Sequence, residues 1–193
     1  MRKTYPKDVR IVFKQRPLSF HNRATPAAIA SMAANNQNKF WPYHDKLFEG
    51  KKFEDSDLER YAEELGLDME KFKVDIKSKE LAAIVKKHDQ QCVKIGASGT
   101  PAFFVNGRSM SGAKPFAEFK TIIDEELKKA QKRVTDGVPR DQVYAAIMKD
   151  AGKKPSDGSS QLGPRTFRFN LKDSASLGPK TAAATLVIFS DFQ

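Results

Sequence analysis

Apolar and polar residues alternate along the chain in two different periods, which separates predicted strands from predicted helices. Val9 to Gln15, "VRIVFKQ", is a short β-branched run followed by Pro17, and this pattern predicts a strand that leads into a loop. Between residues 26 and 95 the apolar positions recur at helical spacing. The pattern therefore predicts a strand followed by a mainly helical block.

Residues that favour helix ends indicate where the helices of this block begin. Thr25-Pro26 is expected to open the first helix, with threonine as the N-cap and proline at the first helical position. Ser56 with Glu59 has the spacing of a capping box before a second helix. Asp68 is expected to cap the next helix, and the helix that carries Cys92 follows it.

The pattern changes to short apolar runs after residue 95. Ala102 to Val105 is an apolar strand, and Asn106-Gly107 is a strong signal for a two-residue hairpin into a second strand, Arg108 to Ser111. Pro115 is expected to begin a long amphipathic helix that ends near Val134. The sequence up to residue 134 thus combines predicted strands with predicted helices.

Composition shifts beyond residue 134. The predicted segment 135–184 contains a short helix, Pro139 to Asp150, and then the Gly-, Ser- and Pro-rich stretch "GKKPSDGSSQLGP", which is typical of a flexible linker. A second spacer, "SLGPKTAAA", precedes the run "TLVIFSDFQ" at 185–193. Leu186 to Phe189 has the pattern of a buried strand, and the chain breaks off in what resembles an unfinished turn.

Charge and hydropathy argue against two broad classes of partner, nucleic acids and membranes. The net charge of +10 invites comparison with nucleic-acid-binding proteins, but both signs are mixed along the chain and aromatic residues are not interleaved with the basic ones. No apolar run reaches the length of a membrane span, and the N-terminus lacks the apolar core of a signal peptide. We expect neither a nucleic-acid nor a membrane partner.

A single cysteine, Cys92, limits the redox and metal chemistry of these 193 residues. It shares a helical apolar face with His88, so a buried, inert thiol is expected rather than a Cys-His dyad. His21 and His44 lie on other elements without a cysteine or carboxylate at metal-ligand spacing. Neither a metal site nor a cofactor is predicted, and Trp41 and Tyr43 are expected to be core residues.

The order of these elements resembles the DsbA family of thioredoxin-fold thiol:disulfide oxidoreductases. The resemblance rests on "VRIVFKQRPLSFHNRATPAA", "FWPYHDKLFE", "LERYAEELGLDMEKF", "SGTPAFFVNGRSMSG" and the final amphipathic helix, and it covers residues 3–134. It implies that residues 1–134 form one α/β domain with a thioredoxin-like fold and a helical insertion. It also implies disulfide formation or exchange in unfolded or cysteine-containing proteins of a bacterial envelope or periplasmic compartment.

In such proteins a central strand runs directly into a Cys-x-x-Cys motif at a helix N-terminus. There the helix dipole and the free backbone amides lower the pKa of the first cysteine. "VIFSDFQ" resembles that strand, so the resemblance places both redox cysteines after Gln193 and assigns no catalytic residue within the chain. The chain as written is therefore expected to be inactive. It is either a piece of a tandem protein or a circular permutant, and the sequence leaves both open.

The resemblance also predicts where residues 185–190 lie and which loop meets the substrate. The family's strand before the cysteines lies between the strands that resemble 9–15 and 102–105, so residues 185–190 are expected to complete the sheet. Either its own chain or a swapped neighbour supplies this strand, giving a monomer or a strand-swapped homodimer. Gly99, Thr100 and Pro101 match the cis-proline loop that contacts an extended substrate. A non-catalytic peptide-binding module that uses this loop is the alternative function.

Overall fold

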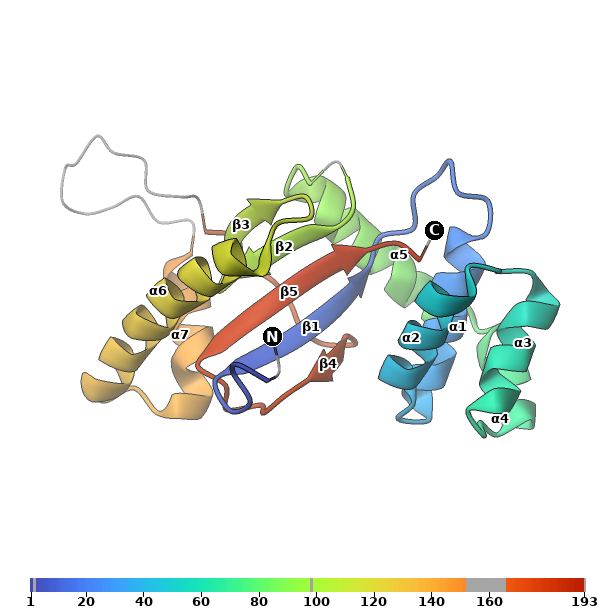
Figure 1. Cartoon of the computed structure of the whole chain (residues 1–193), viewed down its shortest axis with the longest axis horizontal. Coiled ribbons are helices and arrows are strands. Elements are labelled where there is room, and N and C mark those ends of the chain that lie inside the picture. The colour runs from blue at the N-terminus through green and yellow to red at the C-terminus, as the bar shows by residue number, and fades with distance from the viewer. Residues whose placement is uncertain (2, 98, 152–165, 193) are drawn as a thin grey trace. The chain divides into compact units, whose positions relative to one another are not determined.

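The structure is a computed structural model that describes residues 1, 3–97, 99–151 and 166–192 (Figure 1). It consists of two compact units. The first unit comprises Met1–Phe13 and Pro101–Ile188, and the second comprises Lys14–Thr100 and Phe189–Gln193. The division passes through two strands, β1 (Val9–Gln15) and β5 (Ala184–Ser190).

The first unit is built on a five-stranded sheet in the order β3-β2-β5-β1-β4. β2 comprises Ala102–Val105, β3 Arg108–Ser111 and β4 Ala175–Leu177. The strand from the end of the chain, β5, thus lies between β2 and β1, as expected of residues 185–190. At its start the Ala184 N–H donates to the Asp8 carbonyl at 2.9 Å. The backbone N–H and C=O groups on the facing edges of β1 and β2 therefore find their hydrogen-bond partners in β5.

The β2–β3 hairpin has the turn that Asn106-Gly107 predicts. Both residues have positive φ, 47° and 84°, which matches the twist of the two strands, and Phe103 pairs with Met110. Asn106 is buried, and its Oδ1 accepts the Thr185 N–H at 2.9 Å, while the Asn106 N–H donates to the Thr185 carbonyl at 2.9 Å. The turn residue therefore also fixes the start of β5.

Helices cover the two faces of this sheet. Phe119 and Ile123 of α6 (Phe116–Thr135) pack with Val9, Val105 and Leu186 in one apolar cluster, which agrees with the predicted amphipathic helix. Arg10 of β1 points to the opposite face because side chains alternate along a strand. There its guanidinium lies 5.7 Å from the centre of the Tyr144 ring of α7 (Val143–Asp150). A 3₁₀ turn, Arg140–Gln142, precedes α7.

The segment before β5 differs from the predicted spacer. Residues 175–177 form β4, an edge strand that pairs antiparallel with β1, with Val12 opposite Ser176. Gly178 follows with φ 103°, and a Cβ there would lie 2.6 Å from the Val9 carbonyl oxygen, so a glycine is needed for this close approach. The pairing partner of β4 is distant in sequence, which hides the strand from local pattern. The predicted linker "GKKPSDGSSQLGP" lies outside the described residues.

The second unit is the predicted helical block. Its helices are α1 (Ala24–Asn36), α2 (Phe40–Gly50), α3 (Asp55–Glu64), α4 (Met69–Asp75) and α5 (Lys79–Lys94). α1 contacts the other four, and its buried face is formed largely by alanines, whose small side chains allow the neighbouring helices to approach closely. Tyr43 is fully buried and donates to the Leu58 carbonyl at 2.9 Å, as expected of a core residue.

Two predicted helix starts are each wrong by two residues. α1 begins at Ala24 with Arg23 at the N-cap, so Thr25 does not cap it, and α3 begins at Asp55 with Glu54 at the N-cap, so Ser56 does not. The Arg23 side chain donates to the Phe53 carbonyl at 2.7 Å and pairs with Asp55. This tertiary contact holds both starts together. Asp68 caps α4 as predicted, accepting the Lys71 N–H at 3.1 Å.

Candidate functional site

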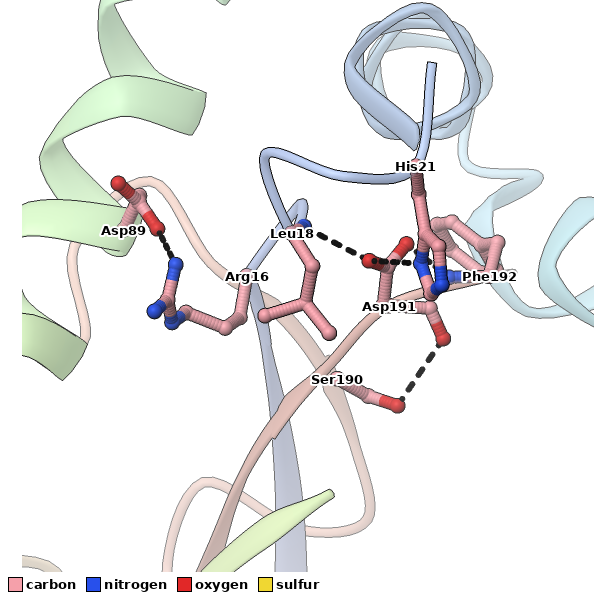
Figure 2. A network of polar contacts seen from close by, with 7 residues as sticks. All are labelled: Arg16, Leu18, His21, Asp89, Ser190, Asp191 and Phe192. Carbon is pink, nitrogen blue, oxygen red and sulfur yellow. Dashed lines mark hydrogen bonds and ion pairs between the residues drawn. The ribbon is translucent and has the colours of Figure 1, made fainter. Parts of the chain in front are cut away.

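The carboxyl end of β5 is the place to which the resemblance assigns a redox motif, and its residues from Phe189 onward belong to the second unit. Ser190 ends the strand, and its carbonyl accepts the Arg16 N–H at 3.0 Å. Asp191 and Phe192 follow, and both are buried. Figure 2 shows these residues beside the loop that follows β1. The strand end is thus held by that loop.

Asp191 is the main anchor of this strand end. Its side chain is 1% exposed. Oδ2 accepts the Leu18 N–H at 2.7 Å and lies 3.0 Å from His21 Nδ1, and Oδ1 accepts the Phe192 N–H at 2.8 Å (Figure 2). A buried carboxylate is stable only when its oxygens are hydrogen-bonded in this way. The arrangement fixes the direction in which the backbone leaves β5.

Phe192 attaches the same strand end to α2. Its ring centre lies 5.3 Å from that of Phe48 and 5.8 Å from that of His44. His44 also contacts Trp41, at 5.2 Å between ring centres. Burial lowers the pKa of His44, and the hydrogen bond between its ring and the Asp45 carboxylate opposes this effect. Trp41 is only partly buried, so the prediction that it is a core residue is wrong, although its ring belongs to this aromatic cluster.

Two large aromatic side chains of the second unit are open to solvent. Phe20 is 73% exposed, and Phe48 is 41% exposed. Phe20 makes an edge contact with the His21 ring, at 4.6 Å between ring centres, and Phe48 contacts Phe192. Both therefore belong to the residues around Asp191. Each ring offers an apolar surface to solvent, and single exposed aromatic residues of this kind are common on protein surfaces.

The loop predicted to bind substrate lies just before β2. Gly99, Thr100 and Pro101 form a bend there, and Ser98 lies outside the described residues. The boundary between the two units falls between Thr100 and Pro101. The role of these three residues in substrate binding stays a prediction.

Cys92 is buried in α5, as predicted. Its Sγ lies 3.5 Å from the Ala97 carbonyl oxygen, to which it can donate. Burial raises the pKa of this thiol to about 11, although the Arg16 guanidinium opposes the effect. Because the thiolate is the nucleophile, the Cys92 thiol is a poor candidate for exchange chemistry at neutral pH.

His88, one turn from Cys92 on α5, is also buried. Burial lowers the pKa of His88 to about 3, with a further contribution from the positive charge of Lys14, so the imidazole is neutral at pH 7. Its Nδ1 accepts the Gln15 N–H at 3.4 Å. Such a ring stabilises the interior rather than acting as a base. Among the residues that the structure describes, no three His, Cys, Asp or Glu side chains form a group that could hold a metal ion.

The pairing of His21 with Asp191 is the feature that sequence reasoning missed. In the sequence His21 is one of three histidines on different elements and has no recognisable partner. Asp191 lies in the segment that resembles an unfinished turn. A signal was present, because an aspartate directly after a buried strand commonly bonds nearby backbone N–H groups. The partner itself lies on a loop far away in sequence.

Comparison with known proteins identifies the family. Residues 4–124 match the DSBA-like thioredoxin domain. The Na(+)/H(+) antiporter NhaA of Herminiimonas arsenicoxydans is 39% identical over 114 residues, which cover 58% of this chain and 18% of the antiporter. The probable disulfide bond formation protein D of Bacillus anthracis is 34% identical over 115 residues, 53% of this chain and 50% of that protein.

This chain thus spans about a fifth of the antiporter and half of the disulfide bond formation protein. No solved structure matches the chain. No helix among the described residues is long and apolar enough to cross a membrane. The sheet with its helical insertion has the thioredoxin-like architecture expected from the resemblance, and the chain belongs to the family of DSBA-like thioredoxin domains.

Proposed function

We propose that this chain is the scaffold of a thiol:disulfide exchange domain that acts on cysteine-containing proteins of the bacterial envelope. The observation that carries the proposal is the position of β5 between β2 and β1, with Asp191 fixing its carboxyl end. In the family this end runs into the Cys-x-x-Cys motif. Family membership and the likeness to a disulfide bond formation protein support the substrate class.

The 193 residues by themselves are proposed to be inactive in exchange. Their one cysteine is buried, and its raised pKa leaves little thiolate at neutral pH. Exchange proceeds by thiolate attack and a mixed disulfide, which a second thiol must then resolve. Both redox cysteines are proposed to follow Gln193, in a tandem protein or a permutant. Pairing of β5 with its own chain is favoured over exchange with a neighbour.

The test is the reduction of a disulfide-bonded protein by dithiothreitol, with the chain and its Cys92→Ala variant compared at equal concentration. Both are expected to leave the rate at the background level. A rate above background that disappears in the variant would show that Cys92 takes part in exchange. A rate that persists in the variant would be assigned to a contaminant, since the variant has no thiol.

A second candidate function is non-catalytic binding of extended peptides through Gly99, Thr100 and Pro101. The exposed rings of Phe20 and Phe48 favour it, because apolar side chains of an unfolded segment can pack against them. Fluorescence anisotropy of a labelled, cysteine-free, Leu- and Val-rich peptide measures such binding. Phe20→Ser is expected to weaken it, whereas Phe116→Ser, at another exposed ring, serves as the matched control.

A further inference from the structure

A pocket of about 460 Å³ lies in the first unit, between α7 and residues 168–171. This volume is within the range of small-molecule sites in proteins. Its walls are mainly apolar and include Tyr144, Met148, Phe169 and Leu171. Two cationic residues, Lys149 and Arg168, complete the lining. Neither the family resemblance nor the proposed exchange chemistry uses this pocket.

Both walls of the pocket are fixed by other parts of the unit. The Phe167 N–H donates to the Gly107 carbonyl at 2.8 Å, and the Phe169 ring centre lies 4.8 Å from that of Phe104 in β2. Arg168 joins the two walls, because its Nε donates to the Met148 carbonyl at 2.8 Å and its Nη2 to the Lys149 carbonyl at 3.1 Å. The guanidinium therefore has a defined position before any ligand arrives, which lowers the entropic cost of binding.

The charges at the pocket favour an anion. Lys149 makes no ion pair with any residue that the structure describes, and two of the donors of Arg168 are used by carbonyls at the end of α7. Asp150, the next residue on α7, does not line the pocket and pairs with Arg133 at 3.0 Å. None of the described residues that line this pocket is acidic. A ligand carboxylate would thus meet two cations without a competing negative charge.

Tyr144 keeps the inner wall free of negative charge. Burial raises the pKa of its hydroxyl, although the nearby Arg10 guanidinium opposes this, so the ring is neutral at pH 7. The positive guanidinium of Arg10 lies against the ring. Within the described part of the chain the buried Tyr144 hydroxyl has no hydrogen-bond partner. The apolar wall is therefore backed by a cation and not by a carboxylate.

We propose that this pocket binds an apolar carboxylate, with the hydrocarbon or aromatic body against Met148, Phe169 and Leu171 and the carboxylate between Lys149 and Arg168. This chemistry is shared by a free fatty acid and by the carboxyl end of an apolar peptide. The proposal goes beyond the exchange function and does not depend on it. An exposed ion pair contributes about 0.2 to 1 kcal/mol, which corresponds to a change of about one and a half- to fivefold in Kd.

The experiment follows amide resonances of the ¹⁵N-labelled full chain at low salt during titration with octanoate. A second arm uses a short acetylated Leu-Phe peptide with a free carboxyl end. Octanamide and the peptide amide are the matched neutral ligands. We expect saturable shifts in α7 and residues 168–171, with the arm that saturates at lower concentration identifying the source. The neutral ligands are expected to bind more weakly.

Variants separate charge from fold. Lys149→Gln is expected to weaken binding of the carboxylate ligand about one and a half- to fivefold and to leave the neutral ligand unchanged. Lys128→Gln, an exposed lysine of α6 that does not line the pocket, is expected to change neither. Ala145→Trp fills the pocket and is expected to abolish both. Absence of saturable shifts in both arms, equal affinity for acid and amide, or no effect of Lys149→Gln would overturn the proposal.

Discussion

Oδ2 of Asp191 lies 3.0 Å from Nδ1 of His21, although 170 positions separate the two residues along the chain. The same oxygen accepts the Leu18 N–H, so one carboxylate joins the end of β5 to the loop after β1 (Figure 2). This contact holds the strand end within the second unit. The proposed function depends on this contact, because Asp191 would determine where the exchange motif begins after β5.

Removal of the Asp191 carboxylate is expected to destabilise the chain. Asp191→Ala leaves the N–H groups of Leu18 and Phe192 without their acceptor, at about 1 to 3 kcal/mol for each buried group left unpaired. Asp191→Asn retains one acceptor oxygen and is expected to cost less. Urea unfolding followed by circular dichroism measures both. Asp141→Asn, at an exposed position, is the control, and equal midpoints for Asp191→Ala and this control would contradict the role given to Asp191.

Acidification is expected to weaken the fold through His88. Its pKa in the folded state is about 3, against 6.5 for an exposed histidine, so unfolding takes up a proton below pH 6.5. Its contribution to stability is therefore complete above pH 6.5 and declines as the pH falls toward 3, by at most about 1.4 kcal/mol per pH unit.

The measurement compares the free energy of unfolding of the chain and of His88→Gln between pH 7 and pH 5, where carboxylates of ordinary pKa remain mostly ionised. Glutamine can still accept the Gln15 N–H, so the variant isolates the titration from the lost hydrogen bond. The variant is expected to have a flatter profile. Parallel profiles would mean that His88 is accessible to protons in the folded state.

Cys92 is expected to react slowly with thiol reagents while the chain is folded. A pKa of about 11 in place of 9.0 reduces the thiolate fraction about 100-fold at pH 8, and burial further limits access. Alkylation by iodoacetamide in buffer and in 6 M guanidinium chloride measures the difference. Similar rates in the two solvents would contradict a buried thiol and would reopen the possibility that Cys92 takes part in exchange.

Gly107→Ala is expected to destabilise the chain by more than the cost of placing an alanine at a positive φ. A Cβ at residue 107 would lie 2.4 Å from the Phe167 carbonyl oxygen, whereas a Cβ at Gly112 would have no described atom within 4 Å apart from those of its neighbours along the chain. Both glycines have positive φ, so Gly112→Ala, expected to cost about 1 kcal/mol, measures the backbone strain. Thermal unfolding gives the difference, which is the cost of the clash. Equal losses would mean that residues 166–169 adjust freely.

Local patterns predicted most elements of the fold but not the contacts that join them. The Asn106-Gly107 turn, the Asp68 cap and the amphipathic α6 each depend on residues within a few positions of one another, and all three are confirmed. β4 was missed because its partner β1 is more than 150 residues away. The starts of α1 and α3 were misplaced because Arg23 bridges the two, an interaction that neither capping pattern contains.

The candidate site shows the same division. Burial of Cys92 and His88 follows from helical spacing and was predicted from it. The position of β5 came from resemblance to a family, since an apolar run alone does not specify its neighbours. The His21–Asp191 contact forms only when the loop after β1 lies against the end of β5. Neither segment has a local sequence pattern that predicts this contact.

The position of β5 in the middle of the sheet also bears on how the chain folds. β1 is among the first segments along the sequence and β5 among the last, so the central pairing of the sheet has a high contact order, which is associated with slow folding. Until residues 184–190 arrive, β1 and β2 each present an unpaired edge that can associate with other chains. Expression at low temperature, or with a chaperone that shields strand edges, should therefore raise the soluble yield of this chain.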